Sequence, residues 1–256
     1  MVSIHHIVII GSGNTAGFLG SALVKRGYKI DAVISRNTDS GNRLATRLNT
    51  IFTTDTSIIS EADIVFVCTS DDNIAEVSAQ LPATGALVCH CAGSISIEAL
   101  KQQRKGVFYP LQTLRNDGDI TLPDECPFLV EASVKTDEAL LCNLAVSLGY
   151  TAATADSRQR MVYHLAAVFA NNFTNAMLLA SEEITEKQHL NFSLLQPLIH
   201  QTVQKLGHGS HFKQQTGPAR RGDKGTLNLH RNLIDDTVMR DMYDAISAFI
   251  ARKFGH

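Results

Sequence analysis

Residues 3–17 read SIHHIVIIGSGNTAG, a β-branched run that leads directly into a glycine turn. Residues 18–26 continue with the pattern of a helix. Strand, glycine turn and helix in this order are the context that a dinucleotide-binding fingerprint requires, although an ordinary βα turn can have the same spacing. Small residues permit the tight turn, the approach of the backbone to a pyrophosphate and close helix–strand packing. We therefore predict cofactor contacts from Gly11, Ser12, Gly13, Asn14, Thr15 and Ala16, with the phosphates at the helix N-terminus.

The second predicted strand, residues 29–35, indicates which dinucleotide binds. In this fold the residue that reads the adenosine ribose follows the glycine turn by about 20 positions, and an acidic residue there selects NAD. This chain has Ser35 and Arg36 instead. A guanidinium beside hydroxyls suits a 2′-phosphate, so we expect NADP as cofactor and NAD less favoured. The alternative is that Arg36 is a solvated loop residue beside a helix cap.

Further apolar runs alternate with helical patterns and predict a parallel α/β domain. Residues 62–68 are nearly all apolar, as in a central parallel strand, and end at Thr69 and Ser70. Such strand ends border the cofactor groove, so both residues are predicted cofactor contacts. Ser94, after the run at 86–91, is expected to cap the next helix or to contact the nicotinamide, and the two roles are compatible. The remaining strand candidates are residues 106–109, 127–131 and 150–154.

The character of the chain changes near residue 155. Residues 156–186 contain no Gly or Pro and predict one helix of about 30 residues, or roughly 45 Å. Residues 191–207, 222–233 and 237–254 predict further helices. We therefore expect an N-terminal Rossmann domain, a doubly wound parallel sheet at residues 1–154, followed by a smaller all-α domain at 155–256. A helix this long also suggests a partner subunit, and we expect a homodimer through the helical domain.

Polar residues on the predicted long helix are candidates for chemistry. His164, Asn171, Asn172 and Asn175 share one face at 3.6 residues per turn. His can donate a proton to a developing alkoxide or amine near neutral pH, and Asn can bind polar substrate groups. The alternative is a polar helix–helix interface across a dimer. A second candidate is the segment at residues 216–223, where Arg220 or Arg221 could hold a carboxylate, or could belong to a polar turn.

Composition narrows the class of protein. Hydrophobic residues make up 44%, charged residues 19%, and the net charge is −2. This balance is typical of a globular protein and offers no basis for binding nucleic acid. No apolar run approaches the roughly 20 residues of a membrane span. Five cysteines without a Cys-x-x-Cys pattern indicate reduced thiols in a cytoplasmic protein. Strand alternation would separate His90 from Cys89 and Cys91, so no metal site is expected.

Several motifs, spread over nearly the whole chain, resemble one family. They are Gly11-Ser12-Gly13-Asn14, His90-Cys91-Ala92-Gly93-Ser94, Tyr109-Pro110-Leu111-Gln112-Thr113, Glu131, Tyr163-His164, Asn172-Phe173, and Thr216-Gly217-Pro218 with Arg221-Gly222-Asp223. Together they resemble the Rossmann-like oxidoreductases whose C-terminal part is domain-of-unknown-function family 2520 (DUF2520). More distantly, the chain is similar to pyrroline-5-carboxylate reductase, the deazaflavin-dependent NADP oxidoreductases and the 3-hydroxyacid dehydrogenases.

The resemblance implies a homodimeric NAD(P)-dependent oxidoreductase whose helical domain is like the C-terminal domain of 6-phosphogluconate dehydrogenase. The expected reaction is hydride transfer to a small carbonyl or imine substrate, of the keto acid or cyclic imine class. His164 would supply the proton, Asn172 would position the substrate and Arg221 would bind its carboxylate. Pro110 and Gln112 would contact the substrate at the nicotinamide end.

Two other functions stay open. Some relatives look like ketopantoate reductases, and a non-catalytic NADP-binding sensor or interaction protein would keep the same fold. The 3-hydroxyacid dehydrogenases use a Lys on the long helix, but residues 156–186 contain none. His164 with Asn172 is the substitute that we predict.

Overall fold

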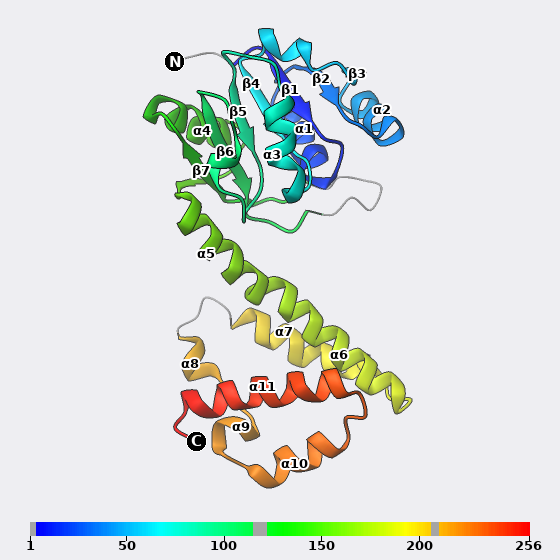
Figure 1. Ribbon diagram of the computed structural model, residues 1–256. Coiled ribbons are helices and arrows are strands. Elements are labelled where there is room, and N and C mark those ends of the chain that lie inside the picture. Colours follow the sequence, from blue (N-terminus) through cyan, green and yellow to red (C-terminus); the bar gives the residue numbers. More distant parts are fainter. Residues whose placement is uncertain (1–3, 115–121, 206–209) are drawn as a thin grey trace. The chain divides into compact units, whose positions relative to one another are not determined.

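The computed structural model describes residues 4–114, 122–205 and 210–256, and it divides into two compact units, Met1–Val168 and Phe169–His256 (Figure 1). The division falls inside the long helical run, whereas the predicted domain boundary lies at residue 154, just before that run begins. The first turns of the run therefore belong to the first unit. Ser3, the predicted start of the first strand, lies outside the described residues.

The first unit is built on an eight-stranded sheet with the order β3-β2-β1-β4-β5-β6-β7-β8. This order over the first six strands is that of a Rossmann domain, which confirms the predicted fold class. The strands are β1 (Ile7–Ile10), β2 (Ile30–Ile34), β3 (Ile51–Thr53), β4 (Ile64–Val67), β5 (Leu87–His90), β6 (Lys105–Pro110), β7 (Phe128–Ala132) and β8 (Ala152–Thr154).

Two features of the sheet differ from the sequence prediction. The short strand β3 at the edge was not predicted, since Ile51–Thr53 offers only three residues of pattern. The pairing of β6 with β7 is antiparallel, whereas β7 pairs with β8 in parallel. Apolar runs predict that a strand exists, but its direction depends on how the preceding connection travels, which local sequence does not record.

Two apolar layers cover the sheet, and strand alternation divides β1 between them. Ile7 and Ile9 pack in the layer with α1 (Asn14–Lys25), α2 (Thr38–Arg47) and α4 (Lys135–Ser147). Val8 and Ile10 pack in the layer with η1 (Ser57–Glu61), α3 (Ile74–Gln80) and η3 (Ile97–Ala99). A short 3₁₀ turn, η2 (Asp71–Asn73), joins β4 to α3. Both faces of the central strands are therefore buried, as a parallel sheet requires.

The predicted long helix is a continuous helical run, but a π-helical turn interrupts it. α5 (Ser157–Ala167) begins at Asp156, whose carboxylate accepts from the backbone N–H of Gln159 at 2.8 Å in a capping box. The π turn η4 (Val168–Phe173) follows, and α6 (Thr174–Lys187) completes the run. A π turn bonds i to i+5, so the 3.6-residue period behind the predicted polar stripe fails beyond Val168. The assignment of His164, Asn172 and Asn175 to one face therefore loses its basis.

The second unit contains the remaining helices, and it is all-α over the described residues. They are η5 (Phe192–Leu195), α7 (Gln196–Gln204), α8 (His211–Gln214), α9 (Pro218–Arg221), α10 (Lys224–Asn232) and α11 (Thr237–Lys253). Gly222 was expected to start a helix but instead ends α9 in the left-handed conformation. Asp223 is the N-cap of α10 and accepts from Thr226 N at 3.0 Å. The predicted end of the 191–207 helix lies outside the described residues.

Searches of the described residues give two further facts. No helix among them is long and apolar enough to cross a membrane. They also contain no group of three or more His, Cys, Asp or Glu side chains that could hold a metal ion.

Candidate functional site

The turn between β1 and α1 is packed at two positions and open at a third. Gly11 has a φ of +116°, and a Cβ at this residue would lie 2.3 Å from the carbonyl oxygen of Cys68. Ala16 is fully buried. Gly13, the N-cap of α1, has no atom within 4 Å of the place a Cβ would take. The turn therefore leaves open space at the start of the helix, where the N–H groups of the first turn have no helical partner and suit an anion.

A cavity of about 380 Å³ opens beside this turn. It brings together predicted cofactor residues from three strand ends: Gly11, Gly13, Ser35, Arg36, Thr69 and Ser70. The hydroxyl oxygen of Thr69 is buried and has no hydrogen-bond partner among the described residues. A buried hydroxyl without a partner is costly, and a ligand oxygen or nitrogen would satisfy it. The open Gly13 and the unpartnered Thr69 hydroxyl both fit a bound dinucleotide.

Ser12 joins the glycine turn to the end of β2. Its Oγ lies 2.9 Å from Ser35 Oγ and 2.7 Å from Ser40 Oγ, so three hydroxyls form one cluster. Ser12 and Ser40 also line a second cavity of about 340 Å³, together with Gly13, Gly17, Arg43, Leu44 and Arg47. Arg43 and Arg47 were not predicted. Their signal is a four-residue spacing on the helix that follows Arg36, which turns both toward one side of α2.

The other predicted N-terminal contacts have structural partners. Asn14 donates from Nδ2 to the carbonyl of Leu114 at 3.0 Å, which ties the glycine turn to the segment after β6. Thr15 is half-buried on the first turn of α1. Gln112 donates to the carbonyl of Glu125 at 3.1 Å and accepts from Thr113 N at 2.9 Å, so its amide braces its own loop. Pro110 is buried at the end of β6.

Ser94 does not cap a helix. Its hydroxyl donates to a carboxylate oxygen of Asp71 at 2.5 Å, linking the segments that follow β5 and β4. The cap of η3 is Ser96, which accepts from Glu98 N at 3.2 Å. The capping alternative for Ser94 is therefore wrong, and its contact places it at the carboxyl ends of two neighbouring central strands.

His164 is the predicted proton donor, and it lies at the same edge of the sheet. Its Nδ1 is 3.0 Å from the hydroxyl of Tyr109, near the end of β6, and the two rings meet edge to face with centroids 6.0 Å apart. A Cβ on Gly93 would lie 2.8 Å from both His164 Nδ1 and Tyr109 Cζ. Gly93 thus provides the space in which these two side chains meet. Neither Tyr109 nor Gly93 was predicted as a site residue.

A buried ion pair holds the start of α5 on the sheet. The fully buried guanidinium of Arg160 pairs with Glu131 of β7 and donates to the carbonyl of Ile95. Ser157 donates to Glu131 at 2.8 Å and accepts from Ile97 N at 3.0 Å. Arg160 precedes His164 by one helical turn, so these bonds also fix where His164 stands. The sequence signals were an Arg four residues before the His and the presence of Glu131 among the family-like motifs.

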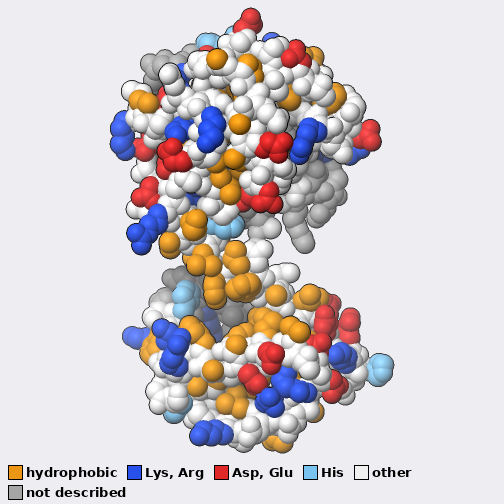
Figure 2. All heavy atoms as spheres, in the orientation of Figure 1, with side chains coloured by type: hydrophobic (Ala, Val, Ile, Leu, Met, Phe, Trp, Pro, Cys, Tyr) orange, Lys and Arg blue, Asp and Glu red, His pale blue; other side chains and the backbone are white. Residues whose placement is uncertain are grey.

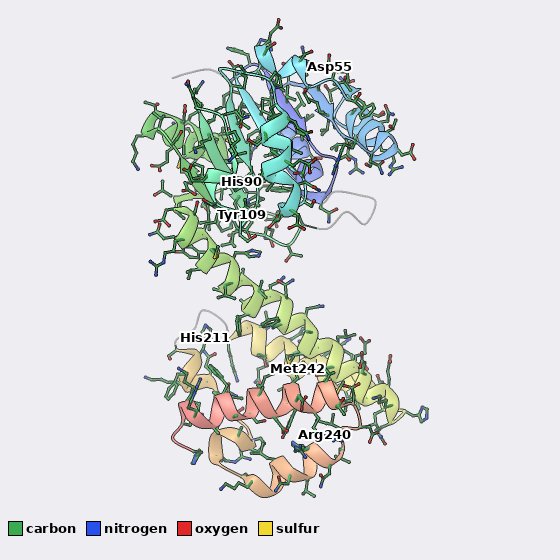
Figure 3. All side chains as sticks on the ribbon, viewed as in Figure 1. Asp55, His90, Tyr109, His211, Arg240 and Met242 are labelled. Atoms are coloured by element: carbon green, nitrogen blue, oxygen red, sulfur yellow. The ribbon has the colours of Figure 1, made fainter. Side chains whose placement is uncertain are left out.

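His90 is the last residue of β5, and its register partner on β6 is Val107, two residues before Tyr109 (Figure 3). The side chain is fully buried, its Nδ1 accepts from Ala92 N at 3.2 Å, and its Nε2 has no partner among the described residues. Burial lowers the pKa of His90 to about 4, and the charge of Arg160 acts in the same direction. His90 is therefore neutral at physiological pH. Burial and the charge of Asp71 raise the pKa of Tyr109, so its hydroxyl is also neutral.

Asn172 and Arg221 lie in the second unit and are exposed. Asn172 is part of the π turn. Arg220 donates to the carbonyl of Gln215 and stacks on Phe254 with its guanidinium carbon 4.9 Å from the ring centroid. Arg220 is thus engaged within its own unit, which leaves Arg221 as the arginine of this segment for a ligand. The proposed roles of Asn172 and Arg221 stay predictions.

Known proteins resemble the chain in both of its parts. Residues 6–92 match the family model described as NADP oxidoreductase coenzyme F420-dependent, and residues 126–250 match DUF2520. No curated protein matches the chain. A crystal structure from Bacteroides fragilis, named as a "putative NADP oxidoreductase", is 35% identical, covers 97% of this chain and 98% of its own, and has a TM-score of 0.86. The chain belongs to this NADP oxidoreductase family.

Two more distant structures are similar to this NADP oxidoreductase, and their similarity bears only on the fold. A protein from Thermotoga maritima is 22% identical over 97% of this chain and 98% of its own, with a TM-score of 0.73. A 1-pyrroline-5-carboxylate reductase from Streptococcus pyogenes is 15% identical over 98% of each chain, with a TM-score of 0.62. Family membership makes the protein an oxidoreductase with a nicotinamide cofactor, and the predicted resemblance to the DUF2520 family is confirmed.

Proposed function

We propose that this oxidoreductase uses NADPH to reduce a small carbonyl or imine substrate. The observation that carries the proposal is the contact between Tyr109 and His164. This contact holds His164, a side chain able to carry a proton, at the carboxyl edge of the sheet. Other strand ends at the same edge line the cofactor cavity. A reductase needs both a hydride source and a proton source, because the reduced oxygen or nitrogen becomes strongly basic.

The cofactor would be held by the glycine turn, with its phosphates at the start of α1 and its adenosine end between Arg36 and Thr69. NADPH supplies the hydride when it is bound. We propose that Arg36 favours the 2′-phosphate over a ribose hydroxyl, with Arg43 and Arg47 adding positive charge nearby. Titration of NADPH and NADH with the wild type and Arg36→Ala tests this preference. Equal or tighter binding of NADH by the wild type would contradict it.

His164 is the proposed proton donor, and general acid catalysis of this kind contributes roughly 10²- to 10⁴-fold in rate. We expect His164→Ala to lower kcat by about that factor and to leave NADPH affinity unchanged. His230→Ala is a matched control, because His230 makes the same kind of contact with Tyr243 in the second unit. Equal turnover by His164→Ala and wild type would remove His164 from the role.

The reaction class is testable before the substrate is known. A panel of keto acids, cyclic imines and simple ketones is incubated with NADPH that carries deuterium on one face of C4. Stereospecific loss of that deuterium into a product supports the reductase, whereas no transfer to any member favours a binding protein without turnover. Ketopantoate belongs in the panel, since the family resemblance makes it a specific expectation.

A homodimer through the helical unit is also part of the proposal. Ala219 and Ile234 are the only buried apolar side chains among the described residues of the second unit. Many large apolar side chains remain exposed there, and Figure 2 shows hydrophobic side chains gathered on this unit. They include Phe173, Leu179, Leu194, Leu198, Leu229, Leu233 and Phe249. Exposed apolar surface of this extent marks an interaction site, and a second copy of the chain would cover it.

Sedimentation tests the dimer directly. We expect a species of twice the chain mass of 27.9 kDa. Leu179→Asp on α6 would shift it toward monomer, while Gln201→Asp, on an exposed polar position of α7, would leave it unchanged. A wild-type monomer at micromolar concentration would overturn this part of the proposal.

Asn172 and Arg221 are the proposed contacts for the polar groups and the carboxylate of the substrate. The effect of Asn172→Ala and Arg221→Ala on KM tests these two roles.

A further inference from the structure

The chain contains two His–Tyr pairs of nearly the same geometry. In the first unit, His164 Nδ1 lies 3.0 Å from the Tyr109 hydroxyl, with centroids 6.0 Å apart and ring planes at 75°. In the second unit, His230 Nδ1 lies 3.1 Å from the Tyr243 hydroxyl, with centroids 6.1 Å apart and planes at 74°. Their surroundings differ, because His230 is exposed whereas His164 is half-buried.

The surroundings of the first pair restrict how it can move. Gly93 approaches both rings so closely that even a methyl group would not fit between them. One turn earlier on the same helix, Arg160 is tied to Glu131 and to the backbone of Ile95. The start of the helix that carries His164 is thereby tied to the sheet, Gly93 lies close to Nδ1 and Cγ of the ring, and Tyr109 is held in a strand. The imidazole therefore keeps one orientation as long as the Tyr109 hydroxyl binds it.

The direction of this hydrogen bond follows from the chemistry of the two groups. A phenol is a good donor and a poor acceptor, and Nδ1 of a neutral imidazole without its proton is a good acceptor. The Tyr109 hydroxyl has no other hydrogen bond within the described parts of the chain. In the neutral ring the hydroxyl therefore donates to Nδ1, and the ring proton lies on Nε2. In the imidazolium, the form that can give up a proton, Nδ1–H donates to the hydroxyl oxygen and Nε2–H stays free.

We propose that Tyr109 is a positioning residue, which keeps Nδ1 of His164 occupied and leaves Nε2 as the ring nitrogen that faces the substrate. The inference rests on the proposed function, because it assigns His164 as the proton-carrying side chain. Tyr109 acts through His164 and does not itself touch the reacting atoms. Without the hydroxyl, the neutral ring populates both tautomers and the imidazolium loses the partner of its Nδ1–H, so Nε2 no longer keeps one direction toward the substrate.

Nitrogen-15 NMR of the histidine side chains tests this assignment without any substrate. His164→Ala identifies the His164 signals in the spectrum of the full chain. We expect the neutral His164 ring of the wild type to be the Nε2–H tautomer. Tyr109→Phe keeps the ring and removes the hydroxyl, and it should move both His164 nitrogen shifts toward the average of two tautomers. Tyr243→Phe, the matched control, should move the His230 signals and leave those of His164 unchanged.

Turnover measured on the wild type, Tyr109→Phe and Tyr243→Phe connects the tautomer to the reaction. We expect Tyr109→Phe to lower kcat on the order of tenfold with NADPH affinity unchanged, because orientation of a catalytic group is lost while the cofactor site is intact. Tyr243→Phe should retain wild-type kcat. Unchanged His164 shifts in Tyr109→Phe overturn the proposal, and so does a changed tautomer with wild-type kcat. If the wild type reduces no panel substrate, the proposed function fails, whereas the NMR result still decides whether Tyr109 orients His164.

Discussion

Replacing Gly93 by alanine should disturb the candidate site at a single point. The new Cβ would lie 2.8 Å from both His164 Nδ1 and Tyr109 Cζ, whereas ordinary contacts begin at 3.4 Å. The rings must therefore separate from this carbon by about 0.6 Å, and overpacking of this kind costs about 1–3 kcal/mol. A displacement approaching 1 Å in a catalytic group costs roughly 10²-fold in rate, so we expect kcat to fall by about 10- to 100-fold.

The assay is NADPH oxidation with a panel substrate, together with urea unfolding and NADPH titration of each protein. Gly85→Ala is the matched control, because a Cβ at Gly85 meets no atom within 4 Å and the residue lies in the same unit. We expect Gly85→Ala to keep wild-type kcat. Wild-type kcat in Gly93→Ala, with the variant folded and binding NADPH normally, would refute the reasoning that the close approach of Gly93 positions His164.

Three other outcomes follow from the same structure. Gly13→Ala should weaken NADPH binding at least tenfold, because the new Cβ would occupy the open space that we assign to the phosphates, and isothermal titration measures this affinity. The free energy of unfolding should change little, because the Cβ meets no packed protein. Arg160→Met should lower the free energy of unfolding in urea by about 3–5 kcal/mol, because the carboxylate of Glu131 loses its ion-pair partner. The double variant with Glu131→Gln should recover part of that loss. The pKa of His90 is lowered to about 4 in the folded state, so the unfolded chain binds its proton first as pH falls. The free energy of unfolding should therefore fall as pH drops from about 6.5 to 4, with about 2 kcal/mol lost at pH 5. The difference between the free energies of unfolding at pH 7 and pH 5 should be smaller in His90→Asn than in the wild type.

Local pattern was sufficient for most of the first unit. The glycine turn and the strands at β1, β2, β4 and β5 follow from short apolar runs and small residues whose meaning does not depend on distant contacts. Caps are also local features, because a cap such as Asp156 or Asp223 bonds within its own turn. Ser94 was ambiguous between two roles, and the deciding partner, Asp71, is 23 residues away.

The helical run shows where a uniform period fails. The continuous run from α5 to α6 confirms the prediction of about 30 helical residues. Composition was enough for this prediction, because the segment contains no Gly or Pro. The π turn at Val168–Phe173 has no composition signal, yet it invalidates every face assignment that crosses it. The link between His164 and the asparagines that follow it therefore rests on an assumption of regular geometry, whereas the link between His164 and Tyr109 rests on an observed contact.

The sequence by itself determined that this protein has a Rossmann domain with a cofactor turn, because the residues involved are adjacent in the chain. Tertiary structure alone decided which side chains surround His164. Tyr109 lies near the end of β6 and Gly93 follows β5, whereas Arg160 belongs to α5 and Glu131 to β7, which runs antiparallel to β6. Tertiary folding brings these separate segments together around His164. No spacing along the chain encodes that convergence, so the partners that orient the predicted proton donor became visible only once the sheet had formed.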